Sequence, residues 1–384
     1  MRKKIVSLFS GIGGLEYGFC SSKFSVELLC ENDPAAQSVL KKHHPGVKVE
    51  ADVTTLKSIP MCDILLAGFP CQDLSQAGRK VGIAGERSGL VGHLFRLIKK
   101  AKPAPSWVIL ENVPYMLSLD RGNAMNLLTS TFESLGYSWA YRVVDARAFG
   151  VPQRRHRVIF VASKKEDPRT ILFKESYDIG NIDGKPTEFN PKNSYGFYWT
   201  EGKLGIGWTK EGIPPIKGGS TVGIPSPPAI WIPSKDFVGT ISLNDAERAQ
   251  GFPENWTEPA SDSEFKKNSR WRLVGNAVCA DVSTWLASQI LKPGEGVHAL
   301  DKPLGAKWPK SAWGSKGQRY EACVSTWCAV PRALNVIKYL KHPLKPLSAR
   351  ATNGFVSRAL LSTNIVYPKE FIASLKQHAK NYEQ

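Results

Sequence analysis

Short apolar runs alternate with segments of helical periodicity through residues 1–163. Between the runs, apolar residues recur at three- and four-residue steps, which predicts helices over 34–43, 90–101 and 124–135. The predicted strands cover 3–10, 25–32, 47–52, 63–69, 106–112, 141–146 and 156–163. Strands that alternate with helices are typical of a doubly wound, Rossmann-like parallel sheet, so we predict an α/β fold here.

The pattern changes after Lys164. From there to about Val238 the chain is rich in Gly, Pro, Asn and Trp and has no sustained period, which indicates turns and short extended pieces. Helical character returns over 242–252, where Ser242 and Asn244 are both candidate N-caps, and again near 276–291. We therefore expect a first domain over 1–163, a second, smaller and irregular domain over 164–274, a helix over 275–292 and a C-terminal extension over 293–384.

Composition limits the cellular compartment and the kinds of site that we expect. The 384 residues are 42% hydrophobic and 22% charged, with no apolar run long enough to span a membrane. The N-terminus does not resemble a signal peptide, so we expect a cytoplasmic protein with no membrane partner. The seven cysteines form no CxxC pair and no ligand set with histidines, which predicts neither a disulfide framework nor a metal site.

The formal net charge of +17 is unevenly spread. Residues 164–294 carry equal numbers of basic and acidic side chains, and the excess lies in the regions on either side. Basic ends around a neutral middle indicate a polyanionic partner, most simply nucleic acid. Lysines that serve only solubility would give the same count, so charge alone leaves both interpretations open.

The first predicted strand leads into "FSGIGGLEYGF" (9–19), where Gly11, Gly13 and Gly14 suit a tight turn that lets the backbone approach a ligand. Glu31 ends the second strand 20 residues after Gly11, where a carboxylate can bind ribose hydroxyls, and Asp52 ends the third. An ordinary strand-to-helix turn would explain the glycines alone. With the two carboxylates, an adenosine-type ligand is favoured. Because neither a third phosphate-binding glycine nor a P-loop lysine follows, S-adenosylmethionine fits better than NAD or ATP.

Reactive residue types fall at the carboxyl ends of the following strands. Cys71 follows the fourth strand, and Glu111 and Asn112 end the fifth. The segment "PQRRHR" (152–157) brings Gln153, Arg155 and Arg157 to the last strand. Taken singly, Glu111 suits a strand-end salt bridge and the arginines a solvated surface. Taken together around a cofactor loop, they indicate catalysis.

A thiolate is a strong nucleophile that can add to an electron-poor ring carbon when arginines supply a positive field. A carboxylic acid on the next strand can protonate a ring nitrogen and ease that addition. For cytosine this means attack at carbon 6, protonation at N3 and methylation at carbon 5. Carbon 6 is shielded in the base stack, so the cytosine must be extruded from the duplex.

An ordered set of motifs carries a resemblance to a known family. The chain resembles the cytosine-5 DNA methyltransferases of bacterial restriction–modification systems. The similarity covers nearly all of 5–163 and 240–291. Its pieces are "SLFSGIGGLEYGF", "ENDPAAQSVL", "AGFPCQDLSQAG", "ERSGLVGHLFRLI", "ILENVP", "FGVPQRRHRVIFVAS", "NDAERAQGFPENW" and "VGNAVCADVSTWLASQI".

The resemblance implies roles at the matching positions. Cys71 would be the nucleophile, Glu111 would contact N3 and the exocyclic amine, and Arg155 with Arg157 would hold the cysteine loop and the cytosine or its phosphate. Gln153 and Asn112 would support the site. The S-adenosylmethionine pocket would be lined by Phe9, Gly11, Gly13, Glu31, Asp52, Val53, Pro70, Asn276 and Val278.

The resemblance also implies an organisation and partners. Residues 1–163 would bind cofactor and perform catalysis, 164–274 would recognise double-stranded DNA, and the helix over 275–292 would return to the first domain. A cognate restriction endonuclease acting on the same site, a monomeric state and the bacterial cytoplasm are expected from the family.

Some features depart from the family pattern. Asn32 follows Glu31, where many members place a bulky residue against the adenine, and a segment of about 90 residues with a net positive charge follows the last motif. We hypothesise that 293–384 supplies DNA contacts, with "GAKWPKSAWGSKGQRY" (305–320) offering cations and aromatic rings for phosphates and bases. A helical lid docked on the sheet for stability is the alternative.

Three other functions fit the sequence less well. A tRNA cytosine-5 methyltransferase is disfavoured because the motif is "FPCQ" rather than "PPCQ" and no Cys-Phe-Thr segment follows. A DNA-binding protein without catalysis conflicts with the intact Cys71, Glu111 and Arg155. An NAD-dependent oxidoreductase would need hydride-transfer partners that do not accompany the loop.

Overall fold

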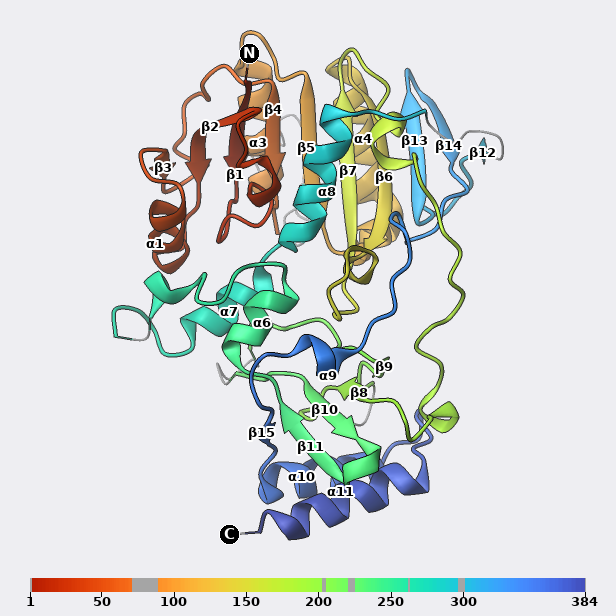
Figure 1. The fold of residues 1–384 in the computed structure, drawn as a ribbon. Helices are drawn as coiled ribbons and strands as arrows, with labels where there is room; N and C mark the ends of the chain where they lie inside the picture. The colour runs from red at the N-terminus through yellow and green to blue at the C-terminus, as the bar shows by residue number, and fades with distance from the viewer. Residues whose placement is uncertain are drawn as a thin grey trace. The chain divides into compact units, whose positions relative to one another are not determined.

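The computed structural model describes residues 2–70, 89–201, 205–219, 225–261, 263–295 and 301–383. The chain divides into two compact units (Figure 1). The first unit comprises Met1–Phe149, His156–Asp178 and Ala277–Pro331. The second comprises Gly150–Arg155, Ile179–Asn276 and Arg332–Gln384.

The first unit is built on a ten-stranded sheet with the order β12-β14-β13-β6-β7-β5-β4-β1-β2-β3 (Figure 1). All seven strands predicted from the sequence are present. They are β1 (Lys3–Leu8), β2 (Phe24–Cys30), β3 (Lys48–Glu50), β4 (Ile64–Ala67), β5 (Trp107–Asn112), β6 (Ser138–Asp145) and β7 (His156–Ser163). Three further strands come from the C-terminal region: β12 (Lys302–Pro303), β13 (Ser311–Ser315) and β14 (Gln318–Glu321).

The α/β fold class is confirmed, but the sheet is mixed rather than wholly parallel. Strands β3, β2, β1, β4 and β5 are parallel neighbours. Strand β7 lies antiparallel to both β5 and β6, and β13 lies antiparallel to β6. A parallel neighbour requires a crossover connection, usually a helix, whereas the segment between β6 and β7 contains only the short 3₁₀ helix η5 (Ala146–Phe149).

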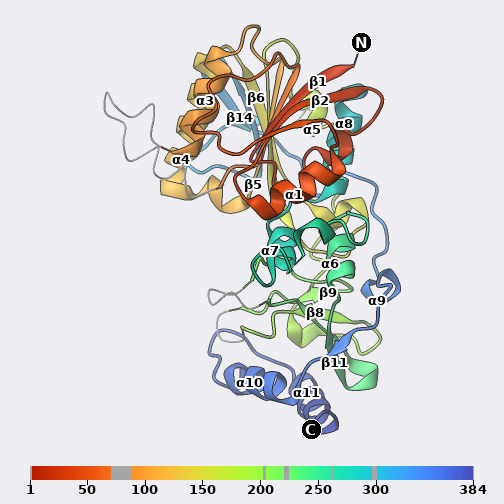
Figure 2. The same ribbon diagram turned by 90° about the vertical axis from the view of Figure 1, so that its left-hand side faces the viewer.

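Helices cover both faces of this sheet. Helices α3 (Leu90–Lys100) and α4 (Asn123–Ser134) lie on one face, and α5 (Arg169–Leu172) and α8 (Ala280–Leu291) lie on the other (Figure 2). The core under α3 and α4 includes Leu94, Leu128 and Phe160, all fully buried. On the opposite face, the buried Arg142 of β6 donates to the carbonyl of Leu172 at 2.7 Å, at the end of α5.

Helix α1 (Pro34–His43) has the bounds predicted from the sequence. The Asp33 carboxylate caps it by accepting from the Ala35 backbone N–H at 3.0 Å, and Pro34 occupies the first helical position. The cap determines where the chain turns after β2, so that Glu31 lies between the strand end and the helix.

The second unit contains a five-stranded sheet with the order β15-β11-β10-β8-β9. Its strands are β8 (Tyr195–Phe197), β9 (Thr209–Lys210), β10 (Ala229–Ile232), β11 (Phe237–Thr240) and β15 (Lys345–Pro346). Its helices are α6 (Leu243–Ala249), α7 (Ser269–Asn276), α9 (Val336–Tyr339), α10 (Ala349–Leu360) and α11 (Lys369–Asn381). Ser242 is the N-cap of α6 and accepts from the Asp245 backbone N–H, whereas Asn244 lies inside the helix.

The C-terminal residues do not form a body of their own. Residues up to Pro331 belong to the first unit, where β13 extends the sheet beyond β6. Residues from Arg332 belong to the second unit, where Phe355, Phe371 and Leu375 complete a hydrophobic core with strands β8 and β10. The structure therefore divides the chain at positions other than the expected boundaries of 163, 274 and 292, because segments distant in sequence pair in the same sheets.

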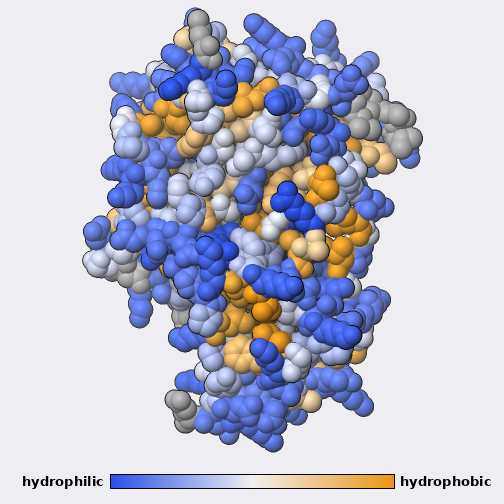
Figure 3. Space-filling model, viewed as in Figure 1, coloured by the Kyte–Doolittle hydropathy of each residue, from blue (hydrophilic) through white to orange (hydrophobic). Residues whose placement is uncertain are grey.

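The surface seen in Figure 3 is predominantly hydrophilic, with hydrophobic side chains gathered in separate patches. Among the described residues, no helix is both long and apolar enough to cross a membrane. The same residues contain no group of three or more His, Cys, Asp or Glu side chains arranged to hold a metal ion.

Candidate active site

The glycine-rich loop lies at the carboxyl end of β1. Phe9, Gly11 and Gly13 all have positive φ, and Gly11 donates its backbone N–H to Glu31 Oε2 at 2.7 Å. The other oxygen of Glu31 accepts from the Asp33 backbone N–H at 2.9 Å. Burial raises the pKa of Glu31, although these two backbone donors act in the opposite direction. The carboxylate predicted to bind ribose is thus tied to the loop itself.

The space above the loop suits a ligand. A Cβ placed on Gly11 would meet no atom within 4 Å, so the loop borders open space at that point. Asp52 lies two residues after strand β3, and Thr54 donates to it through its backbone N–H at 2.8 Å and its hydroxyl at 2.7 Å. These hydrogen bonds lower the pKa of Asp52 and favour its carboxylate form. A polar, charged rim around an open glycine turn fits an adenosine-type ligand.

Val53 points into the protein, unlike the neighbouring Asp52, which is partly exposed. Its side chain is buried in the hydrophobic core, and its carbonyl oxygen accepts from Arg96 at 3.0 Å. Arg96 also donates to the Leu56 carbonyl oxygen at 2.8 Å, so α3 fixes the segment after β3.

The segment around Val278 packs directly on the glycine loop. A Cβ on Gly14 would lie 2.3 Å from the Val278 carbonyl oxygen, so only glycine fits there. One turn further on, the Gly18 backbone N–H donates to Ser283 Oγ of α8 at 2.9 Å. The sequence analysis did not predict this role for Ser283. A serine among the apolar residues of this helix could have indicated a buried hydrogen bond.

Glu111 lies at the carboxyl end of β5 with 8% of its surface exposed. Arg157 of β7 forms a salt bridge with it, with Nε 2.9 Å from Oε1. The other oxygen, Oε2, is 4.0 Å from the position of a Cβ on Gly68, so the carboxylate faces the end of β4. The structure thereby brings together two residues that the sequence placed 46 positions apart.

Asn112 ties the two strand ends together. Its Nδ2 donates to the Phe69 carbonyl oxygen at 3.0 Å, and its Oδ1 accepts from the Val113 backbone N–H at 2.9 Å. The rings of Phe9 and Phe69 lie edge to face, 6.4 Å apart, which packs the end of β4 against the end of β1. Pro70 follows, and Cys71 lies outside the described residues, as do residues 72–88.

Three candidate residues belong to the second unit. Gln153 donates from Nε2 to the Ala249 carbonyl oxygen at 2.7 Å and accepts from the Ile216 backbone N–H at 2.9 Å. Arg155 is buried and donates to the Gly275 carbonyl oxygen at 3.1 Å. Asn276 ends α7, and its Oδ1 lies 2.8 Å from a Cβ position on Gly218. Gln153 and Arg155 thus crosslink the backbone of their unit.

Glu16 was not singled out from the sequence. It follows the glycine loop and is fully buried, and neither carboxyl oxygen has a hydrogen bond of ordinary geometry. Burial raises its pKa to about 7, while the nearby hydroxyls of Ser7 and Ser10 partly oppose that shift. A lone glutamate in a glycine-rich motif gives no sequence signal of burial, because its enclosure depends on tertiary packing.

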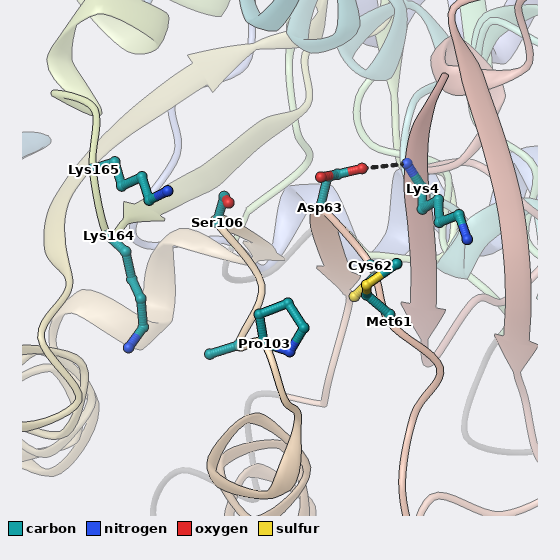
Figure 4. Close-up of a pocket in the computed structure, with 9 residues that line it drawn as sticks. Lys4, Met61, Cys62, Asp63, Pro103, Ser106, Lys164 and Lys165 are labelled. Atoms are coloured by element: carbon teal, nitrogen blue, oxygen red, sulfur yellow. Dashed lines mark hydrogen bonds between the residues drawn. The ribbon is translucent and has the colours of Figure 1, made fainter. Parts of the chain in front are cut away.

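A cavity of about 330 Å³ lies at the opposite edge of the first unit's sheet (Figure 4). Asp63 and Ser106, which line it, immediately precede β4 and β5, so they lie at the amino ends of these strands. Lys4, Lys164 and Lys165 also line it. Glu111 and the glycine-rich loop lie at the carboxyl ends of β5 and β1, and none of the described candidate residues lines the cavity.

Comparison with known proteins identifies the class. A family model described as C-5 cytosine-specific DNA methylase matches residues 3–195. The chain belongs to this family and is a DNA (cytosine-5) methyltransferase of the bacterial restriction–modification type.

A relative matches over nearly the full length. The type II methyltransferase M2.BsuMI of Bacillus subtilis strain 168 is 53% identical over 97% of both chains. A second relative, the type II methyltransferase M.MspI of a Moraxella species, is 29% identical over 75% of this chain and 70% of its own length.

Solved structures share the fold. The Dnmt2 methyltransferase of S. pombe superposes with a TM-score of 0.55 and 16% identity, covering 76% of this chain and 99% of its own. A mutant DNMT2 of Spodoptera frugiperda gives 0.51 and 14% over 76% of this chain and 100% of its own. At these identities the likeness bears on the fold alone.

Proposed function

We propose that the enzyme methylates carbon 5 of an extruded cytosine within a short specific sequence of double-stranded DNA, using S-adenosylmethionine and a covalent Cys71 adduct at carbon 6. The observation that carries this proposal is the placement of Glu111. Its carboxyl group faces Gly68, three residues before Cys71, and is held by Arg157 at 2.9 Å. An acid at N3 and a nucleophile at carbon 6 would then act on opposite positions of one ring.

The residues of the first unit suit the cofactor. Glu31 would accept from ribose hydroxyls, Asp52 from the adenine amine, and the turn at Gly11 would admit the ligand without a side chain in its way. Phe9, Gly13, Val53, Pro70, Asn276 and Val278 would complete the pocket. When bound, S-adenosylmethionine would supply an electrophilic methyl group on a sulfonium centre to carbon 5.

The chain's own residues would perform the remaining chemistry. The Cys71 thiolate adds to carbon 6, and Glu111 donates a proton to N3, so that electron density moves to carbon 5. After methylation, carbon 5 loses its proton to water, the bond between sulfur and carbon 6 breaks, N3 returns its proton to Glu111, and the thiolate is restored. Arg157 keeps Glu111 oriented during both steps.

The supporting residues act through the backbone. Asn112 holds the Phe69 carbonyl two residues before Cys71, and so orients the strand end that presents the thiol. Gln153 and Arg155 fix the backbone at Ile216 and Gly275 in the second unit. We propose that these backbone hydrogen bonds help to position the cysteine loop and the base, as the family resemblance implies.

The relatives' names support a proposal for the biological setting. We propose that the enzyme acts in the bacterial cytoplasm as a monomer and protects host DNA from a restriction endonuclease that cuts the same site. The second unit would read the DNA sequence, because its irregular segments carry varied polar side chains that can reach base edges.

The deciding experiment is transfer of tritium from labelled S-adenosylmethionine to unmethylated bacterial DNA, followed by bisulfite sequencing. We expect label in cytosine at one short motif for the wild type, and none for Cys71→Ser. The matched control is Cys323→Ser, because Cys323 is a free, exposed thiol at another site.

Two outcomes would contradict the proposal. Label in tRNA instead of DNA would assign the enzyme to RNA. Transfer by Cys71→Ser at the wild-type rate would exclude the covalent adduct.

A further inference from the structure

The segment Val113–Gly122 follows Glu111 and Asn112 directly, at the carboxyl end of β5. It contains the 3₁₀ helices η3 (Pro114–Leu117) and η4 (Leu119–Gly122). In η3, Met116 is buried in the core whereas the neighbouring Tyr115 is 64% exposed. A large aromatic side chain presented to water beside a candidate active site suggests a surface that a partner covers.

The same segment is strained. Asp120 and Arg121 have φ values of 50° and 55°, and Gly122 follows with 91°, so three consecutive residues adopt left-handed conformations. Each non-glycine residue in this region costs on the order of 1 kcal/mol, and such strain persists where the surroundings enforce it, often at functional sites. The side chain of Arg121 is exposed at this turn.

Trp308, from the C-terminal region of the first unit, holds the turn. Its Nε1–H donates to the Gly122 carbonyl oxygen at 3.1 Å, and a Cβ on Gly122 would lie 2.9 Å from the ring. The ring centroid is 5.8 Å from that of Trp139 and 6.0 Å from that of Tyr141. Because Trp308 packs against these protein groups, its role is to brace the segment rather than to stack on a base.

The other tryptophan of this C-terminal stretch is engaged in the same way. Trp313 stacks on Tyr320 with centroids 4.6 Å apart, the guanidinium of Arg169 lies 3.9 Å from its centroid, and its Nε1–H donates to Asp301 at 2.6 Å. The aromatic residues expected to contact DNA directly therefore serve the sheet and the turn beside it.

We propose that Tyr115 contacts the DNA duplex next to the extruded cytosine, that Arg121 contacts a neighbouring phosphate, and that Trp308 is the positioning residue for both. This inference rests on the proposed function. For a cytosine to reach Glu111, the duplex must approach the edge of the sheet from which Tyr115 projects. Extrusion leaves neighbouring bases partly unstacked, and an aromatic ring can pack on them.

The test uses the full-length enzyme and a duplex that carries the motif found by bisulfite sequencing. Tyr115→Ala is expected to raise the dissociation constant for this duplex about tenfold, within the range for loss of an aromatic–base contact, without changing that for S-adenosylmethionine. Arg121→Ala is expected to lower the slope of log affinity against log salt by about 1. Met61→Ala is the matched control, since Met61 is 54% exposed and lines the cavity at the opposite edge of the sheet.

The positioning role has its own test. Trp308→Phe removes the hydrogen bond to Gly122 but keeps an aromatic ring, and we expect weaker DNA binding with unchanged binding of S-adenosylmethionine. Its effect should vanish in a background that carries both Tyr115→Ala and Arg121→Ala, because Trp308 acts through these two contacts. If Trp308→Phe weakens DNA binding equally in the wild type and in that background, Trp308 acts elsewhere and the positioning role is wrong.

Failure of this inference is distinguishable from failure of the proposed function. If the wild type methylates DNA and Tyr115→Ala binds the duplex as tightly as Met61→Ala, the inferred contact is wrong while the function stands. If the wild type transfers no methyl group to DNA, the proposed function fails first.

Discussion

At the residue scale, the first unit contains two glutamates of opposite character. Glu111 is paired with Arg157 and is 8% exposed, whereas Glu16 is fully buried and forms no ion pair with a cation of the described residues. A buried carboxylate without a cation favours its neutral form, because water no longer stabilises the charge. Glu16 is therefore expected to be a source of pH dependence in this unit.

The pKa of Glu16 is about 7 in the folded protein against an ordinary value of 4.5. The folded state therefore retains a proton that the unfolded chain releases above pH 4.5, and the free energy of unfolding falls as the pH rises to about 7. The loss is up to about 3 kcal/mol, with no further change from this group above that pH. Glu16→Gln should remove the dependence and be more stable than the wild type at pH 8 but not at pH 4.5.

Denaturant unfolding of both proteins at several pH values tests this prediction. Glu27→Gln, on the partly exposed face of β2, is the control and should retain the wild-type pH profile. An identical profile for Glu16→Gln would show that Glu16 is already ionised in the folded protein.

At the scale of elements, two glycines allow α8 and the segment before it to pack closely on the glycine-rich loop. Gly14 lies against the Val278 carbonyl, and a Cβ on Gly18 would lie 2.3 Å from the Ser283 backbone. A strand-to-helix turn and a helix more than 260 positions away thus share one tight interface. The interface explains why two glycines recur after the loop although neither has a positive φ.

Gly14→Ala is expected to force this interface apart, because the added methyl group would overlap a backbone oxygen that cannot rotate away. We expect a loss of stability of about 1–3 kcal/mol and weaker binding of S-adenosylmethionine. Calorimetry and equilibrium binding measure the two effects. Gly305→Ala, where a Cβ meets no atom within 4 Å, should leave both unchanged; equal behaviour of the two variants would refute the tight contact.

At the scale of the whole molecule, the C-terminal residues are divided between two units and complete a core in each. Ala312 joins the core beneath α4, while α10 and α11 bury Phe355 and Phe371 against the five-stranded sheet. Deleting 295–384 would remove core residues from both units, so it could not isolate a contribution to DNA binding. Neutralising exposed lysines such as Lys369, Lys376 and Lys380 would test such a contribution with the fold intact.

Phe371→Ala should destabilise the second unit by about 3–5 kcal/mol, because it empties a site packed against Trp208 and Trp231. We expect a lower melting transition and faster proteolysis within 179–276. Val366→Ala is the control, since that side chain is 75% exposed. A melting curve for Phe371→Ala that coincides with the control would show that α11 contributes little to this core.

The sequence by itself determined the alternating strands and helices of residues 1–163, because apolar periodicity and turn residues act locally. It also determined the strand-end positions of Glu31, Asp52 and Glu111, since a parallel sheet places carboxyl ends at one edge. The direction of β7, antiparallel to both β5 and β6, and the division of the C-terminal region were decided only by tertiary pairing. The same holds for the Glu111–Arg157 pair, the burial of Glu16 and the brace from Trp308 to Gly122, because each depends on segments brought together across the fold.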